Sequence, residues 1–258
     1  MLRIEKNFDK IRLYSLEFTT NIGCKLDCRF CPQEAAVKAY YDYTADSSKP
    51  VATLTFENFK KIYIRLEKNS IVSFSGTSEP LANPETIAMI HYACENNSKI
   101  ALFTTLQSSA RHDMEKLKDV PFLSFVVHVP DEEGNSKFDI TEEYIQTLTY
   151  TVENFTISSL SCHGTIHHAV KGIIEKSDLR VDTTILDRAG YITDPQVKTS
   201  PQTDGRIICV FNPNLAEDIT NLIEEDITKI SPIKVIVFLL LFSKLYTKPY
   251  FISSICAE

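Results

Sequence analysis

The chain has 258 residues, of which 43% are hydrophobic and 24% charged, and its formal net charge is −7. This length and composition are typical of one folded domain with a sizeable core and exclude a low-complexity chain or two full enzyme domains. The acidic balance provides no broad basic field for a phosphate backbone, so nucleic acid is not expected as a partner.

The first elements that the sequence predicts are a strand, a helix and a second strand. Apolar residues alternate along residues 13–18, which indicates a strand leading into a cysteine-rich loop. Thr55 can cap the helix that follows. The apolar stripe of this helix is formed by Phe56, Phe59, Ile62, Tyr63 and Leu66. Residues 71–74 are then expected to form a buried strand that ends in a turn at residues 75–80.

The remaining predicted elements repeat the same alternation. Asn83 followed by Pro84 predicts the start of another helix, because proline at the first helical position loses no hydrogen bond. A further helix is expected at residues 141–152. The further strand candidates are residues 100–103, 122–127 and 155–157. Strands separated by helices form a parallel sheet, so we expect an α/β fold, either an open sheet or a complete or partial barrel.

The sequence also predicts where the protein resides. The apolar run at residues 235–242 is too short for a membrane-spanning helix, which needs about 20 residues. Residues 1–10 are charged and lack the apolar segment of a secretory signal. We therefore expect a cytoplasmic protein without a membrane partner, in which cysteines stay reduced and clustered cysteines more often hold metal than form disulfides.

The most unusual feature is a cluster of cysteines after the first predicted strand. Cys24, Cys28 and Cys31 follow the spacing Cys-x3-Cys-x2-Cys. Three thiolates at this spacing can surround one corner of a cubic iron–sulfur cluster and leave its fourth iron without a protein ligand. A structural zinc site normally has four protein ligands, and no fourth Cys or His lies nearby in the sequence. An open cluster is favoured, and a structural zinc or an electron-transfer cluster is the alternative.

Two motifs together resemble a known family. The cysteine loop, with Phe30 before its last cysteine, is similar to the signature of the radical S-adenosylmethionine (radical SAM) superfamily. Residues 76–80, Gly-Thr-Ser-Glu-Pro, resemble the Gly-Gly-Glu-Pro-like turn that follows the second strand in that family. Thr77 and Ser78 stand where glycines are usual. The resemblance implies a partial (β/α)6 TIM-like barrel at residues 1–190 and a C-terminal extension at residues 191–258.

The resemblance also implies the cofactors and the reaction. Cys24, Cys28 and Cys31 would bind three irons of a [4Fe-4S] cluster, and S-adenosylmethionine would bind the fourth. An electron donor such as a flavodoxin or ferredoxin would reduce the cluster. Reductive cleavage of S-adenosylmethionine would give a radical that abstracts hydrogen from a substrate.

Further residues are implied as contacts of S-adenosylmethionine. Phe30 would lie against the adenine. The turn would present backbone groups to the methionyl ammonium, from Gly76, Thr77, Ser78 and Glu79. Thr105 after the third strand and His128 at the end of the fourth are expected at the same rim, as cofactor or substrate contacts. No catalytic residue is assigned.

Three histidines near residue 165 could also be taken for a metal cluster. Residues 162–164 are expected to form a turn, and His167 and His168 are expected to begin a helix. We therefore expect structural roles for His163, His167 and His168 rather than a metal site.

The C-terminal region is similar at residues 186–190 and 205–209 to the connector into the SPASM or twitch extensions of some radical SAM enzymes. Only Cys209 and Cys256 lie in residues 191–258, so no auxiliary cluster is expected, and we expect the extension to be truncated. The same resemblance suggests a peptide or a sugar-type metabolite as substrate. The alternative function is a non-catalytic iron–sulfur or zinc-binding protein, or an inactive remnant.

Overall fold

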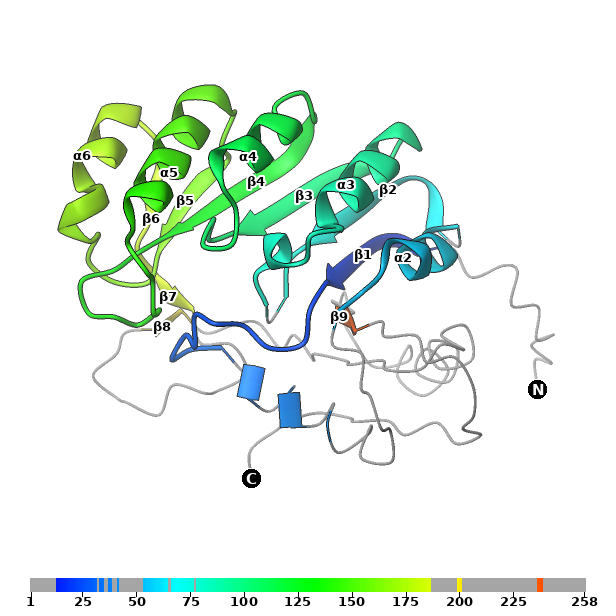
Figure 1. Ribbon diagram of the computed structural model, residues 1–258, viewed down its shortest axis with the longest axis horizontal. Coiled ribbons are helices and arrows are strands. Elements are labelled where there is room, and N and C mark those ends of the chain that lie inside the picture. The colour runs from blue at the N-terminus through cyan, green and yellow to red at the C-terminus, as the bar shows by residue number, and fades with distance from the viewer. Residues whose placement is uncertain are drawn as a thin grey trace.

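A parallel sheet with one layer of helices forms the molecule (Figure 1). The computed structural model describes residues 13–31, 33–34, 37–38, 41, 53–64, 66–76, 78–186, 199–200 and 236–238. The helices α3–α6 lie along one side of the sheet (Figure 1).

Six strands follow one another across the sheet in chain order, and β9 pairs with β1 at the edge. The main sheet consists of β1 (Leu13–Thr19), β2 (Leu66–Phe74), β3 (Lys99–Thr104), β4 (Phe122–Val129), β5 (Ser159–Cys162), β6 (Val181–Asp182) and β9 (Ile236–Phe238). All of its pairings are parallel. A second pair consists of β7 (Ile185–Leu186) and β8 (Thr199–Ser200).

A described helix lies between each pair of neighbouring strands from β1 to β6. The helices are α2 (Phe56–Tyr63), α3 (Thr86–Glu95), α4 (Arg111–Leu117), α5 (Glu142–Asn154) and α6 (His168–Ser177), and a 3-10 turn, η2 (Pro80–Ala82), precedes α3. Parallel strands joined by helical crossovers are the arrangement of a partial (β/α)6 barrel, so the predicted α/β fold is confirmed.

Local sequence signals explain where two of these helices begin. Thr55 caps α2 as predicted, because its side chain accepts a hydrogen bond from the N–H of Asn58. Thr141 caps α5 in the same way, by accepting from the N–H of Tyr144. Both hydroxyls take up backbone donors that the first helical turn leaves without a partner.

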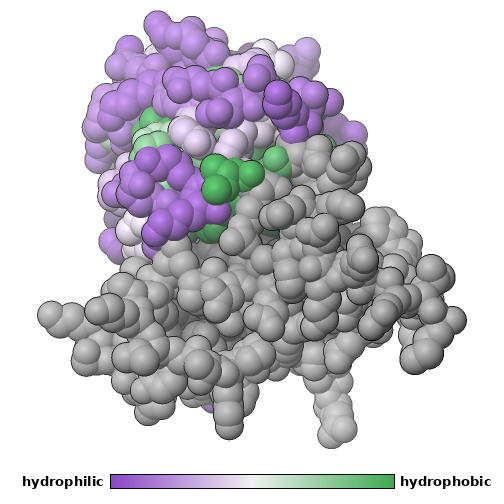
Figure 2. All heavy atoms as spheres, turned by 90° about the vertical axis from the view of Figure 1, so that its right-hand side faces the viewer, coloured by the Kyte–Doolittle hydropathy of each residue, from purple (hydrophilic) through white to green (hydrophobic). Residues whose placement is uncertain are grey.

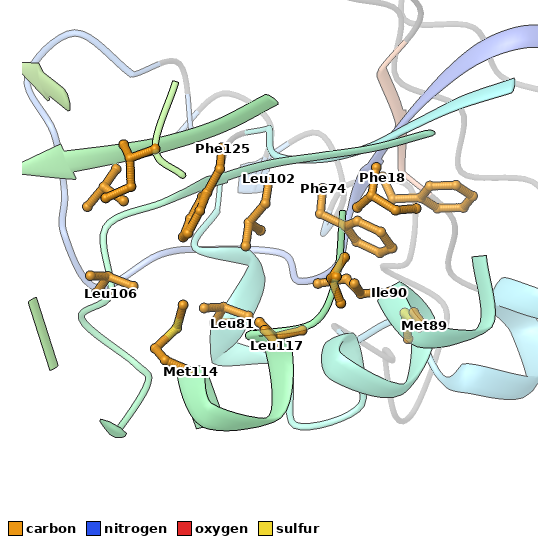
Figure 3. Close-up of a cluster of buried hydrophobic side chains, with 14 of the residues drawn as sticks. Phe18, Phe74, Leu81, Met89, Ile90, Leu102, Leu106, Met114, Leu117 and Phe125 are labelled. Carbon is orange, nitrogen blue, oxygen red and sulfur yellow. The ribbon is translucent and has the colours of Figure 1, made fainter. Parts of the chain in front are cut away.

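The core lies between the sheet and the helices. Phe18, Phe74, Leu102 and Phe125 project from four adjacent strands into this layer, where they are fully buried (Figure 3). Phe18 pairs in register with Phe74, and Leu102 pairs with Phe125. Helical side chains such as Met89 close the layer from the other side. The burial of each side chain of this size stabilises the folded state by about 1.5–3 kcal/mol relative to leaving it exposed.

The opposite face of the sheet is polar. Successive side chains of a strand point to opposite faces, so the residues between the core positions face away from the helices. Glu17 pairs in register with Ser73, Ser73 with Ala101, and Ala101 with Ser124. Apolar side chains therefore cover one face of the sheet, whereas the other face carries carboxyl, hydroxyl and small side chains together with Ile71, Phe103 and Val126.

Three boundaries differ from the sequence prediction. Leu66 does not complete the stripe of α2, because the helix ends at Tyr63 and Leu66 begins β2. Residues 155–157 are not a strand: Phe155 is the C-cap of α5, and the next strand begins at Ser159. Pro84 does not open a helix either. The Asn83 side chain accepts from the N–H of Glu85, and α3 begins at Thr86.

Most of the predicted C-terminal extension, including Cys209 and Cys256, lies outside the described residues. Within it, residues 236–238 belong to the apolar run of the sequence, and they form β9 beside β1. None of the described helices has the length and apolar character required to cross a bilayer. On the side that faces the viewer in Figure 2, the described surface is mostly hydrophilic, with a small hydrophobic group.

Replacement of a core leucine tests the position of the core. We expect Leu102→Ala to lower the free energy of unfolding by about 2–5 kcal/mol, because it leaves a cavity under the helices. Leu123→Ala on β4 is the matched control: this side chain is 53% exposed, and its loss should change the free energy by no more than about 0.5 kcal/mol. If urea denaturation showed the same loss of unfolding free energy for Leu102→Ala and Leu123→Ala, the described core would be contradicted.

Candidate functional site

The cysteine loop leaves the carboxyl end of β1 and turns back on itself. Gly23 and Asp27 adopt positive φ angles of 87° and 42°, which let the chain reverse within a few residues. The N–H of Cys31 donates to the carbonyl of Cys28 at 3.0 Å. The three cysteines are partly buried and line a single pocket. The spacing seen in the sequence therefore brings three sulfur ligands to one wall.

The turn after β2 lies directly against the end of β1. Gly76 has a φ of +112°, and a Cβ atom there would stand 1.9 Å from the Thr19 hydroxyl oxygen. The Ser75 N–H donates to the Phe18 carbonyl at 3.2 Å, and the Thr19 hydroxyl donates to the Ser75 carbonyl at 3.4 Å. Only glycine fits this position, which explains in steric terms why the motif at residues 76–80 begins with glycine.

Glu79 joins this turn to the end of β3. Its carboxylate is buried and accepts four hydrogen bonds. Oε1 accepts from the Leu81 N–H at 3.1 Å and from the Thr104 hydroxyl at 2.5 Å. Oε2 accepts from the N–H of Thr105 at 2.7 Å and from its hydroxyl at 2.5 Å. The side chain thus fixes the turn, and Thr105, a predicted site residue, is one of its two threonine partners.

A second polar network fixes the loop after β1 to the same turn. The Thr20 hydroxyl donates to the Pro80 carbonyl at 3.0 Å. The Asn83 amide donates to the carbonyls of Thr20 and Leu54, at 3.2 and 2.7 Å. All of these groups are buried, so breaking one bond would leave another polar group unsatisfied.

The loop between β4 and α5 holds the cysteine loop from the other side. The Arg29 N–H donates to the Asn135 carbonyl at 2.9 Å, and the Lys137 N–H donates to the Leu26 carbonyl at 2.8 Å. Asn135 is buried, and its N–H donates to the Asp131 carboxylate at 2.8 Å. Sequence reasoning missed this contact because nothing local to residues 131–137 indicates a partner about 106 positions earlier.

One pocket at the carboxyl ends of the strands brings the motifs together. It contains about 640 Å³ of space, part of which is open to solvent. Its lining is formed by Cys24, Leu26, Cys28, Phe30, Cys31, Gln33, Ser75, Gly76, Ser78, Glu79, Phe103, Thr105, His128, Val129, Ser136, Phe138 and His163. Every predicted site residue is among them except Thr77, which lies outside the described residues.

His163 is a pocket residue that the sequence did not reveal. It follows the last residue of β5 and is buried, and its ring lies 4.0 Å from that of Phe30 and 5.5 Å from that of His128. Its Nδ1 lies 3.2 Å from the Thr184 carbonyl, which favours a proton on Nδ1. Its place after a strand was the available signal, but residues 162–164 were interpreted as a turn.

Burial controls the charge of the first cysteine. Removal from water raises the pKa of the Cys24 thiol, and the nearby Glu79 carboxylate raises it further. Backbone groups of Leu26 and Glu79 hydrogen-bond to the sulfur and lower the pKa, but they do not reverse the effect. Without a metal this thiol is protonated at neutral pH, so metal binding releases a proton.

The cysteine sulfurs are not gathered tightly. Among the described residues, one group of three possible metal ligands has all its ligand atoms within 4.8 Å of one another. It consists of Glu132, His167 and His168. The three cysteines do not form such a group. A zinc ion about 2.3 Å from each of three sulfurs would bring them to roughly 4 Å from one another.

Known structures give distant likenesses. No protein-family model and no curated sequence matches the chain. The chain is similar to BtrN in complex with AdoMet and 2-DOIA, with 12% identity, 58% of this chain covered and a TM-score of 0.39. It is also similar to Streptococcus suis SuiB bound to precursor peptide SuiA, with 13% identity, 87% covered and a TM-score of 0.47.

The chain spans about half the length of these structures, covering 57% of BtrN and 48% of SuiB. Such scores and identities are too low to assign a function.

Replacement of Gly76 tests the close approach of the two motifs. We expect Gly76→Ala to lower the free energy of unfolding by roughly 2–5 kcal/mol, because the new Cβ meets Thr19 and the φ angle is unfavourable for alanine. Gly172→Ala on α6 is the control: no atom lies within 4 Å, and helix propensity predicts a gain of about 0.5–1 kcal/mol. A tolerated Gly76→Ala would contradict the described turn.

The Glu79 network makes a separate prediction. Glu79→Gln replaces one carboxylate oxygen with an NH2 group. Whichever oxygen is replaced, the NH2 group then faces a backbone N–H, that of Leu81 or that of Thr105. One donor is then left facing another, which should lower the free energy of unfolding by about 1–3 kcal/mol. The exposed Glu115→Gln should have an effect of no more than about 1 kcal/mol. Similar denaturation midpoints for the two variants would refute the assigned role of Glu79.

Proposed function

We propose that this chain is a radical SAM enzyme. Cys24, Cys28 and Cys31 would hold three irons of a [4Fe-4S] cluster, and S-adenosylmethionine would bind beside it. When bound, this pair supplies one-electron cleavage of the sulfonium and a carbon radical that abstracts hydrogen from a substrate. The residues of the chain position these groups and exclude water.

The meeting of two sequence motifs in one pocket supports this proposal. The cysteine loop and the Gly76–Glu79 turn lie about 50 residues apart, and a backbone group of Glu79 hydrogen-bonds to the Cys24 sulfur. A plain electron-transfer cluster needs no second motif at its open side. A ligand that bridges the cluster and the turn accounts for both.

Ser78 provides a test of fit for a polar ligand. Its side chain lines the pocket and is 9% exposed, and among the described residues its hydroxyl has no hydrogen-bond partner. A buried polar atom of this kind is costly unless something satisfies it. The amino and carboxylate groups of S-adenosylmethionine are suitable partners.

Glu79 would act as a positioning residue rather than a direct ligand. All four hydrogen bonds of its carboxylate come from Leu81, Thr104 and Thr105. It therefore fixes the backbone of the turn, whose carbonyl groups would accept from the methionyl ammonium. Thr105 contributes to the same function through Glu79.

The far wall of the pocket would contact the adenine and the substrate. Phe30 and His163 pack ring to ring, and His128 lies against His163. Phe30 would lie against the adenine, as the motif implies. The two histidines stand on the rim toward β5, where a substrate could be held by hydrogen bonds.

The polar face of the sheet supports a polar substrate. Partly buried hydroxyl side chains project from the face of the sheet opposite α3–α6, namely those of Ser73, Ser124, Ser159 and Ser161. Hydroxyl groups suit a peptide backbone or a sugar-type metabolite, and we propose a substrate of one of these classes. A flavodoxin or ferredoxin would supply the electron. Residues 1–190 would form the catalytic core, and residues 191–258 would form an extension.

Anaerobic reconstitution with iron and sulfide, followed by reduction in the presence of S-adenosylmethionine, tests the proposal. We expect about four irons per chain and formation of 5′-deoxyadenosine. Cys28→Ala should lose the cluster and the product, because one ligand is removed. Cys94→Ala, outside the pocket, should retain both. A cluster that never yields 5′-deoxyadenosine would favour the non-catalytic alternative, and a bound zinc in place of iron would refute the cofactor assignment.

A further inference from the structure

We propose that Glu132, His167 and His168 form a binding site for a divalent transition-metal ion of the zinc type. The site lies outside the cysteine pocket and does not depend on the proposed function. One ligand atom from each residue can be chosen so that all three lie within 4.8 Å of one another. The sequence predicted only structural roles for the two histidines, because they were expected to begin a helix, and Glu132 lies 35 and 36 positions before them.

Backbone pairing holds the two ligand-bearing segments together. Asp131 and Ile166 form an antiparallel bridge just beyond the parallel strands β4 and β5. The Glu132 N–H donates to the Thr165 carbonyl at 2.9 Å, and the His167 N–H donates to the Pro130 carbonyl at 3.0 Å. The ligands therefore sit on a backbone that is fixed without them, so an ion would not have to order the loops.

The neighbouring acid strengthens this arrangement and is not itself a ligand. Glu133 accepts from the N–H of Thr165 at 2.8 Å and from its hydroxyl at 2.6 Å. Gly164 allows this approach, since a Cβ there would stand 2.4 Å from a Glu133 oxygen. The Glu133 carboxylate thus fixes the turn before α6, and the Glu132 carboxylate faces the two histidines.

The distances are close to those of a coordinated ion. His168 Nδ1 lies 3.0 Å from Glu132 Oε1, and His167 Nε2 lies 3.9 Å from Glu132 Oε2. The two imidazole rings are stacked, with centroids 4.2 Å apart. An ion about 2.1 Å from each donor spaces them by roughly 3.0–3.5 Å, so shifts of less than about 1 Å complete the site. The His168 side chain is 79% exposed and has room to move.

Two existing hydrogen bonds compete with the ion. One joins the proposed ligand atoms His168 Nδ1 and Glu132 Oε1, and the other is made by His167. His167 Nδ1 accepts from the Ala169 N–H at 3.2 Å and caps α6, and coordination through Nε2 would place a proton on Nδ1. Losing a cap costs about 1 kcal/mol. Glu132 Oε1 accepts from the His168 N–H at 2.6 Å, so the helix start keeps an acceptor. The competing loss is small beside the binding energy of a three-ligand site.

The ligand set selects the ion. Two imidazole nitrogens and one carboxylate oxygen favour zinc and its transition-metal neighbours over Mg²⁺ and Ca²⁺, which prefer all-oxygen sites. Three protein ligands leave at least one coordination position open. Because the cluster is at the surface, water or a carboxylate of another molecule could occupy that position.

Zinc titration of the full chain tests the proposal, with bound metal measured after equilibrium dialysis under reducing conditions. Thiol sites contribute equally to every variant, so differences between variants are informative. We expect His168→Ala and Glu132→Gln each to bind one ion fewer per chain or to bind it at least about ten-fold more weakly. His112→Ala, an exposed histidine beside Asp113 on α4, should match the parent.

Thermal unfolding supplies the second readout. Zinc that binds the folded state raises the unfolding midpoint of the parent and of His112→Ala, and this rise should be reduced in His168→Ala and in Glu132→Gln. Circular dichroism without zinc checks that each variant is folded. Equal zinc stoichiometry, affinity and thermal response in His168→Ala, Glu132→Gln and the parent would overturn the proposal.

Discussion

The buried Glu79 carboxylate is the interaction on which the site depends. It joins the turn after β2 to the end of β3 through four hydrogen bonds, and the same turn lies against β1 at Gly76. The ends of three neighbouring strands are thereby held in one rigid arrangement. A buried acid with every lone pair engaged is stable in one geometry, because any displacement leaves donors unsatisfied. The cysteine loop follows β1, and its cysteines line the same pocket as this turn.

The rest of the pocket depends on a second connection, between the cysteine loop and the β4–α5 loop. Backbone pairs at Arg29 with Asn135 and at Leu26 with Lys137 close the loop against the rim. The Asn135 amide also donates to the His163 carbonyl at 2.7 Å, which extends the connection to the end of β5. The cysteine loop and the end of β5 at His163 therefore belong to one hydrogen-bonded unit.

Much of this arrangement could be predicted from the sequence, because it is local. The cysteine spacing, the Thr55 and Thr141 caps and the alternation of strands with helices all appear within short windows. The errors arose where local pattern and packing differ. Phe155 and Ile157 are apolar and alternate, but Phe155 ends a helix and Ile157 fills the core, so the strand begins later at Ser159.

Contacts between distant segments were beyond sequence reasoning. The bonds of Glu79 to Thr104 and Thr105, the pairing of Arg29 with Asn135 and the approach of Glu132 to His168 each join residues more than 20 positions apart. The most direct test of the central claim, that the cysteine loop and the Glu79 turn build one binding site, is electron paramagnetic resonance of the reduced cluster. Adding S-adenosylmethionine should shift the g-values, because the proposed function has it bind the open iron of the cluster. An unchanged spectrum with saturating S-adenosylmethionine would contradict the account.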